Sequence, residues 1–64
     1  MPHIQVTLLK GRSADQKRKL AQRFTQAMVE EAGADGSAVT VAFVEVEKES
    51  FARGGILIAD RKPN

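Results

Sequence analysis

The chain has 64 residues with no cysteine and one histidine, and ten Lys and Arg against eight Asp and Glu give it a net charge of +2. This composition excludes disulfides and a closed zinc site, predicts no cofactor and no metal, and is too weakly basic to indicate nucleic acid. No apolar run is long enough to span a bilayer and no secretory signal is recognisable, so we expect one cytoplasmic domain, residues 1–64, without a membrane partner. A chain this short buries only about 60% of its unfolded surface and is marginally stable alone. Without disulfides or a structural metal, we expect it to be stabilised by oligomerisation.

The first predicted element is a strand over residues 2–9. Its apolar residues Ile4, Val6 and Leu8 alternate with polar ones, the period of two that is typical of a half-buried strand. Pro2 stands at the first position, where its missing N–H leaves no hydrogen bond of the sheet unmade.

Residues 13–33 are predicted to hold an amphipathic helix. Ser13 and Gln16 have the spacing of a capping box at its start, and Gly33 is a typical C-cap. Apolar residues recur at intervals of three and four, as expected for a stripe that faces a sheet: Leu20, Ala21, Phe24, Ala27, Met28 and Ala32. The basic run 17–19 is interpreted as a solvated face of the helix rather than a nucleic-acid contact.

The second predicted strand, residues 39–46, is apolar on both of its faces. A strand of that kind is covered on both sides, but one helix covers only one face of a two-stranded sheet. The simplest cover for the other face is another copy of the chain. Strand, helix and strand in this order predict a right-handed β-α-β unit with parallel strands.

The C-terminal segment contains Gly54-Gly55, which allows a tight turn, followed by a short predicted strand over residues 56–59. Residues 60–64 are polar and are expected to form a frayed tail. The predicted fold class is therefore α+β: a β-α-β unit with a C-terminal β-turn and short strand, completed by oligomerisation.

Pro2 is the strongest candidate for a catalytic group, because the chain has no Cys or Tyr and only one His. Removal of Met1, which is normal ahead of a proline, would leave a secondary amine held by the strand. An apolar pocket and a nearby arginine both disfavour the charged amine, so its pKa would fall and the neutral form could act as a base or nucleophile. The alternative is that Pro2 is an ordinary second residue at a frayed terminus.

Two arginines are candidates for binding an anionic substrate. Arg12 precedes the helix N-terminus, where backbone N–H groups favour anions, and its guanidinium can hold a carboxylate in a bidentate pair. Arg53, beside Gly54, could be a second cation at the same site. Each could equally be a solvated surface charge.

Phe51 and His3 are ambiguous from the residues alone. Phe51 could shield the amine from water, although composition favours a place in the core. His3 could be a second acid or base next to Pro2, but alternation along the strand turns it to the opposite side, and we expect it to be solvated.

Taken together, these motifs resemble the 4-oxalocrotonate tautomerase family. The likeness rests on the initial Met-Pro, a Gly-Arg-Ser triplet ahead of the helix, a valine-rich second strand and Phe-x-x-Gly-Gly, with all spacings intact. The resemblance implies short β-α-β chains that assemble as hexamers, which are trimers of dimers, or as related trimers of fused chains. It also implies that Pro2 is a general base acting on a small anionic carboxylate, a 2-hydroxydienoate or 2-oxo acid. Arg12 would bind the substrate carboxylate, and Phe51 would be the apolar wall.

The sequence departs from the family pattern at Thr40. Well-studied members carry a second arginine there, presented to the neighbouring subunit's site, where it polarises the substrate carbonyl. A threonine hydroxyl brings one hydrogen bond and no charge, so we expect weaker stabilisation of an enolate. Arg53 could take over part of that role.

Two further functions stay open beside the homohexameric tautomerase. Hydration or dehalogenation of an unsaturated acid would need a carboxylate that activates water, for which Glu45, Glu47 and Glu49 are the candidates. A non-catalytic subunit of a hetero-oligomer would instead rely on a partner chain for the missing arginine.

Overall fold

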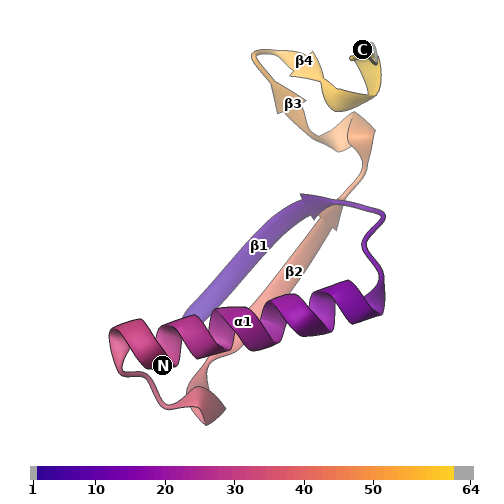
Figure 1. The fold of residues 1–64 in the computed structure, drawn as a ribbon. Coiled ribbons are helices and arrows are strands. Elements are labelled where there is room, and N and C mark those ends of the chain that lie inside the picture. The colour runs from indigo at the N-terminus through magenta and orange to yellow at the C-terminus, as the bar shows by residue number, and fades with distance from the viewer. Residues whose placement is uncertain (1, 62–64) are drawn as a thin grey trace.

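The computed structural model describes residues 2–61, so the predictions about Met1 and about the tail beyond Arg61 lie outside the described residues. The helices and strands are β1 (His3–Leu9), α1 (Ala14–Ala32), β2 (Thr40–Val46), β3 (Ala52–Arg53) and β4 (Ile56–Leu57), and short 3₁₀ helices span Gly36–Ala38, Lys48–Ser50 and Ile58–Asp60. β1 and β2 form a two-stranded parallel sheet with α1 along one side of it (Figure 1). The predicted β-α-β unit is confirmed.

Both predicted ends of the helix are confirmed. The Ser13 side chain accepts the N–H of Gln16 at 3.2 Å, and the Gln16 side chain accepts the N–H of Ser13 at 2.9 Å. Gly33 ends the helix with φ of 68°, a left-handed conformation that residues with a Cβ rarely adopt. Within residues 2–61 we find no helix that could cross a membrane.

Substituting the N-cap, Ser13→Ala, is expected to destabilise the chain by about 1 kcal/mol, because the N–H of Gln16 loses its acceptor. Urea unfolding at one fixed protein concentration measures the change, since the stability of an associating chain depends on concentration. Ser50→Ala is the matched control: Ser50 is exposed, and its side chain makes no hydrogen bond with another described residue. Equal midpoints for the two variants would contradict the capping role.

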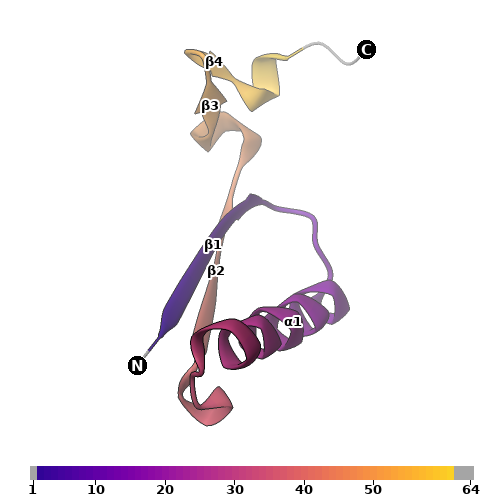
Figure 2. The ribbon, with the colours of Figure 1, turned by 60° about the vertical axis from the view of Figure 1, so that its left-hand side comes forward.

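The register of the sheet assigns its two faces. On one face, Ile4 pairs with Val41, Val6 with Phe43 and Leu8 with Glu45. Lys17 of α1 reaches Glu45 with 2.7 Å between Nζ and Oε1, so this is the face that the helix covers. The other face, here called the open face, has no element over it in Figure 2. Its residues are His3, Gln5, Thr7, Leu9, Thr40, Ala42, Val44 and Val46.

Residues 47–61 form a C-terminal arm that projects beyond the ends of β1 and β2 (Figure 1). At its tip, β3 and β4 pair antiparallel around Gly54 and Gly55, whose φ values of 63° and 81° have the signs of a type I′ turn. The radius of gyration is 15.0 Å, against about 11 Å for a compact chain of this length. The arm therefore makes the molecule elongated.

An elongated chain of this size leaves its apolar side chains in contact with solvent. Among the described residues, none is fully buried. The most exposed large apolar residues lie on the open face, on the arm and near the end of the helix: Val29, Val44, Phe51, Ile56 and Leu57. The open face in particular agrees with the prediction that the helix alone does not cover the sheet.

Four sequence-based details were wrong. The second strand begins at Thr40, because Val39 still closes the preceding 3₁₀ helix with its N–H toward Gly36. The short strand predicted over 56–59 ends at Leu57. The N–H of Ile58 still donates to the carbonyl of Phe51, but the residues before Phe51 form the 3₁₀ helix Lys48–Ser50 and offer no further strand to pair with. On α1, Leu20 and Phe24 are half-buried as expected, but Ala27 and Ala32 are exposed. Phe51 is 45% exposed rather than in a core.

Candidate active site

Pro2, His3 and Thr40 meet where the sheet begins. Pro2 is half-buried ahead of β1, and its carbonyl accepts the backbone N–H of Thr40 at 3.0 Å. The Thr40 hydroxyl lies 2.7 Å from Nδ1 of His3 and 3.4 Å from the same Pro2 carbonyl. The structure thus brings Pro2 and Thr40 together, as two of the predicted site residues, and adds His3 to them.

The contact between His3 and Thr40 was not found by sequence reasoning. His3 is exposed, as expected for a solvated side chain, yet it also has a hydrogen-bond partner. The signal that could have found it is the register of the strands: in a parallel pair, side chains directly opposite each other lie on the same face, and His3 is opposite Thr40.

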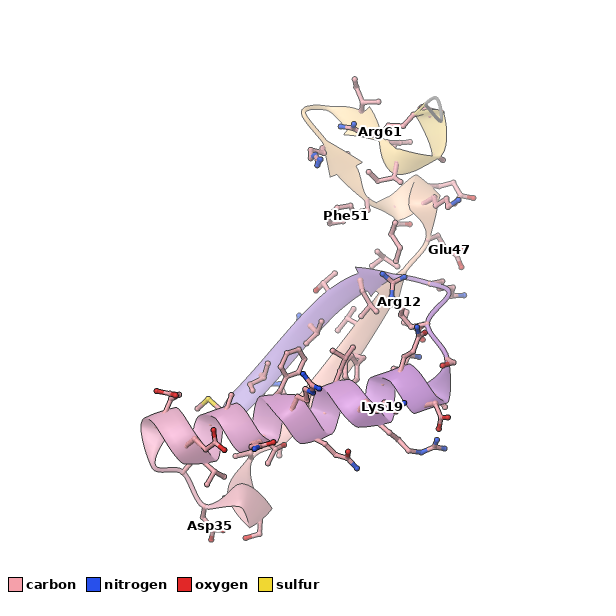
Figure 3. The ribbon with its side chains drawn as sticks, viewed as in Figure 1. Arg12, Lys19, Asp35, Glu47, Phe51 and Arg61 are labelled. Carbon is pink, nitrogen blue, oxygen red and sulfur yellow. The ribbon has the colours of Figure 1, made fainter. Side chains whose placement is uncertain are left out.

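Arg12, Phe51 and Arg53 lie at the other end of the sheet (Figure 3 labels the first two). Arg12 is exposed and directly precedes the helix N-cap. Phe51 stands at the root of the arm, where it lines a pocket of about 70 Å³. The other residues lining that pocket are Thr7, Leu8, Leu9 and Val46. Arg53 lies in β3, and its carbonyl accepts an N–H from the guanidinium of Arg61 at 3.4 Å.

An ion pair joins the root of the arm to the sheet. Nζ of Lys10, just after β1, lies 2.7 Å from Oε1 of Glu47, just after β2. The hydrogen bond that Lys10 donates to the Glu47 carboxylate, and then the negative charge of Glu47, raise the pKa of Lys10 above its ordinary value. Because the pKa of Lys10 is raised in the folded chain, the contact contributes its full stabilisation at any pH below the ordinary lysine pKa. That stabilisation is lost only as the pH rises through the higher pKa of the folded chain. The ion pair is therefore present at neutral pH.

A single chain does not bring its two groups of candidate residues together. Pro2 directly precedes β1 and Thr40 is the first residue of β2, whereas Arg12 and Phe51 follow the ends of these strands. A strand of seven residues, such as β1, spans about 20 Å at its usual rise. One small substrate cannot touch both groups on the same chain. A site that uses all of these residues must be built from more than one chain.

A second and wider hollow lies along α1, lined by Ala21, Gln22, Thr25 and Gln26. It contains none of the predicted site residues and no ionisable side chain. The candidate chemistry is therefore at the two ends of the sheet and not at this hollow.

The chain is similar to known tautomerases over nearly its whole length. Residues 2–61 match the family model described as "Tautomerase enzyme". The 2-hydroxymuconate tautomerase of Bacillus subtilis is 35% identical over 94% of this chain and 97% of its own length, and that of Comamonas testosteroni is 38% identical over 88% and 89%. A heterohexamer 4-oxalocrotonate tautomerase from Chloroflexus aurantiacus has a chain that superposes with a TM-score of 0.91 at 29% identity, covering 97% of this chain and all of that one. The chain therefore belongs to the 4-oxalocrotonate tautomerase family and is an isomerase.

Proposed function

We propose that the chain interconverts the enol and keto forms of small 2-hydroxydienoate or 2-oxo acids, such as 2-hydroxymuconate or phenylpyruvate, with the amine of Pro2 as general base. The observation that carries the proposal is the position of Pro2 at the head of β1, where the N–H of Thr40 holds its carbonyl. Once Met1 is removed, the amine is fixed at the edge of the sheet. A fixed amine is what a general base requires.

The proposed reaction moves one proton. The neutral amine takes the proton of the 2-hydroxyl group, the enol electrons shift to form the carbonyl, and the resulting ammonium gives its proton to a carbon of the substrate. Arg12 binds the substrate carboxylate, and Arg53 provides a second cation. Phe51 is the apolar wall, which together with the cations disfavours a charged resting amine. Thr40 supplies a neutral hydroxyl beside Pro2.

The arrangement of the candidate residues supports a site shared between chains. The amine of one chain would meet the arginine and the arm of another, within a homohexamer or, with a second related chain, a hetero-oligomer. The open face and the exposed apolar residues of the arm are the surfaces available for such an assembly.

The alternative of hydration or dehalogenation has less support. It needs a free carboxylate to activate water, but Glu45 is paired with Lys17 and Glu47 with Lys10, each at 2.7 Å. A carboxylate that is already paired with a lysine is less available to bind and orient a water molecule. Of the three candidates, this leaves Glu49.

Complementation between two defective variants tests the proposal. Pro2→Ala removes the base, and Arg12→Ala removes a charged hydrogen-bond donor, which is expected to raise KM about 10- to 100-fold. Co-expressed in equal amounts, the two chains are expected to recover about a quarter of the wild-type rate, because random assembly unites an intact Pro2 with an intact Arg12 in one site of four. The assay is ketonisation of phenylpyruvate enol and of 2-hydroxymuconate.

The same experiment has clear contrary outcomes. Recovery that does not exceed the sum of the two separate variants would mean that Pro2 and Arg12 do not meet across chains. An inactive wild-type assembly, with Met1 removed as shown by intact mass, would contradict the tautomerase proposal. Activity that appears only after mixing with a second protein would favour the subunit of a hetero-oligomer.

A further inference from the structure

Thr40 makes two contacts with the carbonyl of Pro2. Its backbone N–H lies 3.0 Å from the carbonyl oxygen, and its hydroxyl lies 3.4 Å from it. Proline has no backbone N–H when it is part of the chain, so the carbonyl is the group through which Pro2 enters the ladder of the sheet. Thr40 therefore decides how the residue that carries the amine is held.

The Thr40 hydroxyl has one proton and two acceptors within reach. Nδ1 of His3, at 2.7 Å, is closer than the Pro2 carbonyl at 3.4 Å. If Nδ1 carries no proton, the hydroxyl donates to His3, and the carbonyl keeps only the backbone N–H. If Nδ1 carries a proton, the imidazole donates to the threonine oxygen, and the hydroxyl proton is free to turn to Pro2. The imidazole thus orients the hydroxyl.

Holding the carbonyl also orients the amine. The proline ring fixes φ, so rotation about the Cα–C bond is the remaining soft backbone torsion between the ring nitrogen and the carbonyl plane. A carbonyl fixed from two directions leaves little freedom in that torsion. A base fixed in this way is aligned with its proton before the substrate arrives.

We propose that His3 and Thr40 form a positioning pair for the amine of Pro2: His3, in the tautomer with its proton on Nδ1, donates to the Thr40 oxygen and turns the hydroxyl proton to the Pro2 carbonyl, which Thr40 thereby clamps. This inference rests on the proposed function, since it concerns the alignment of the proposed base. It assigns His3 a role through Thr40, not a contact with the substrate.

Substitutions at both positions test the pair. Thr40→Val keeps the shape of the side chain without its hydroxyl, and His3→Phe keeps a ring without its nitrogen. Loss of one hydrogen bond is expected to lower kcat about fivefold, with KM unchanged because only the base is misaligned. Thr40→Ser, which restores the hydroxyl, should restore kcat. The double variant should be no slower than Thr40→Val alone, because both changes break one connected set of contacts.

Thr25→Val is the matched control, since Thr25 lies on α1 in the hollow away from both ends of the sheet. Wild-type kcat in Thr40→Val, or strictly additive losses in the double variant, would overturn the positioning pair. If Thr40→Val does not assemble, the kcat of His3→Phe decides: a kcat about fivefold below that of the wild type supports the positioning pair, and a wild-type kcat overturns it.

A spectroscopic readout separates this inference from the proposed function. The carbonyl ¹³C resonance of Pro2 reports the hydrogen bonds that it accepts, whether or not the protein is active. It is expected to shift in Thr40→Val but not in Thr40→Ser or Thr25→Val. An unmoved resonance in Thr40→Val contradicts the pair even where tautomerase activity is present, and a moved one supports it even where activity is absent.

Discussion

Replacing Pro2 by alanine is expected to lower kcat/KM for phenylpyruvate ketonisation about 10²- to 10⁴-fold, the contribution that a positioned general base makes. The substitution exchanges a secondary amine in a rigid ring for a primary amine whose φ is free to rotate. The Thr40 N–H can still bind the carbonyl of residue 2, so the strand itself should persist. Stopped-flow or ultraviolet assays of the enol, with circular dichroism as a check on folding, measure the effect.

A fraction of the wild-type protein that keeps Met1 provides the control for this prediction. Its sequence is unchanged, but the nitrogen of Pro2 is an amide and has no basic lone pair. Intact-mass spectrometry identifies the fraction, and its activity should be lost as fully as that of Pro2→Ala. If Pro2→Ala or the fraction with Met1 turned over at the wild-type rate, the amine would not be the base.

Placing a charge on the open face, by Val44→Glu, is expected to break the assembly and to abolish activity. Val44 pairs with Thr7 in the middle of that face and is 40% exposed in the chain. If another copy covers the face, the new carboxylate is buried without a partner, at a cost of order several kcal/mol. Native mass spectrometry or sedimentation gives the mass of the assembly, and the ketonisation assay gives the activity.

Val29→Glu is a control matched in residue type and exposure. Val29 is also 40% exposed, but it lies on α1 and not on the sheet. Its variant is expected to keep the assembly and the activity of the wild type. An intact, active assembly in Val44→Glu would mean that the open face remains in contact with solvent and that another surface joins the chains.

Most of the fold could be predicted because its signals are local. The spacing of Ser13 and Gln16 and the glycine at position 33 define the helix from within a single turn at each end. The Gly54-Gly55 turn is equally local. The exposure of Phe51 could not be predicted, because it depends on the direction in which the arm leaves the sheet. An aromatic residue in a short chain looks like core unless the whole path of the chain is known.

The candidate site was predictable as a list of residues but not as an arrangement. Pro2 and Arg12 were selected for their chemistry, and sequence gives no distance between them. The register of the strands then places His3 against Thr40 at one end of the sheet, and the path of the chain leaves Arg12 at the other. Both facts depend on how β1 pairs with β2, which no single stretch of sequence specifies.

The placement of the proposed base and the proposed carboxylate-binding arginine at opposite ends of one chain has a consequence for the gene. After a duplication, one copy can lose the function of its first residues and the other can lose that of its arginine, and together they still form complete sites. Two incomplete genes then become indispensable to each other without any new residue having arisen. In a chain of this design, a mixed assembly can originate from loss alone.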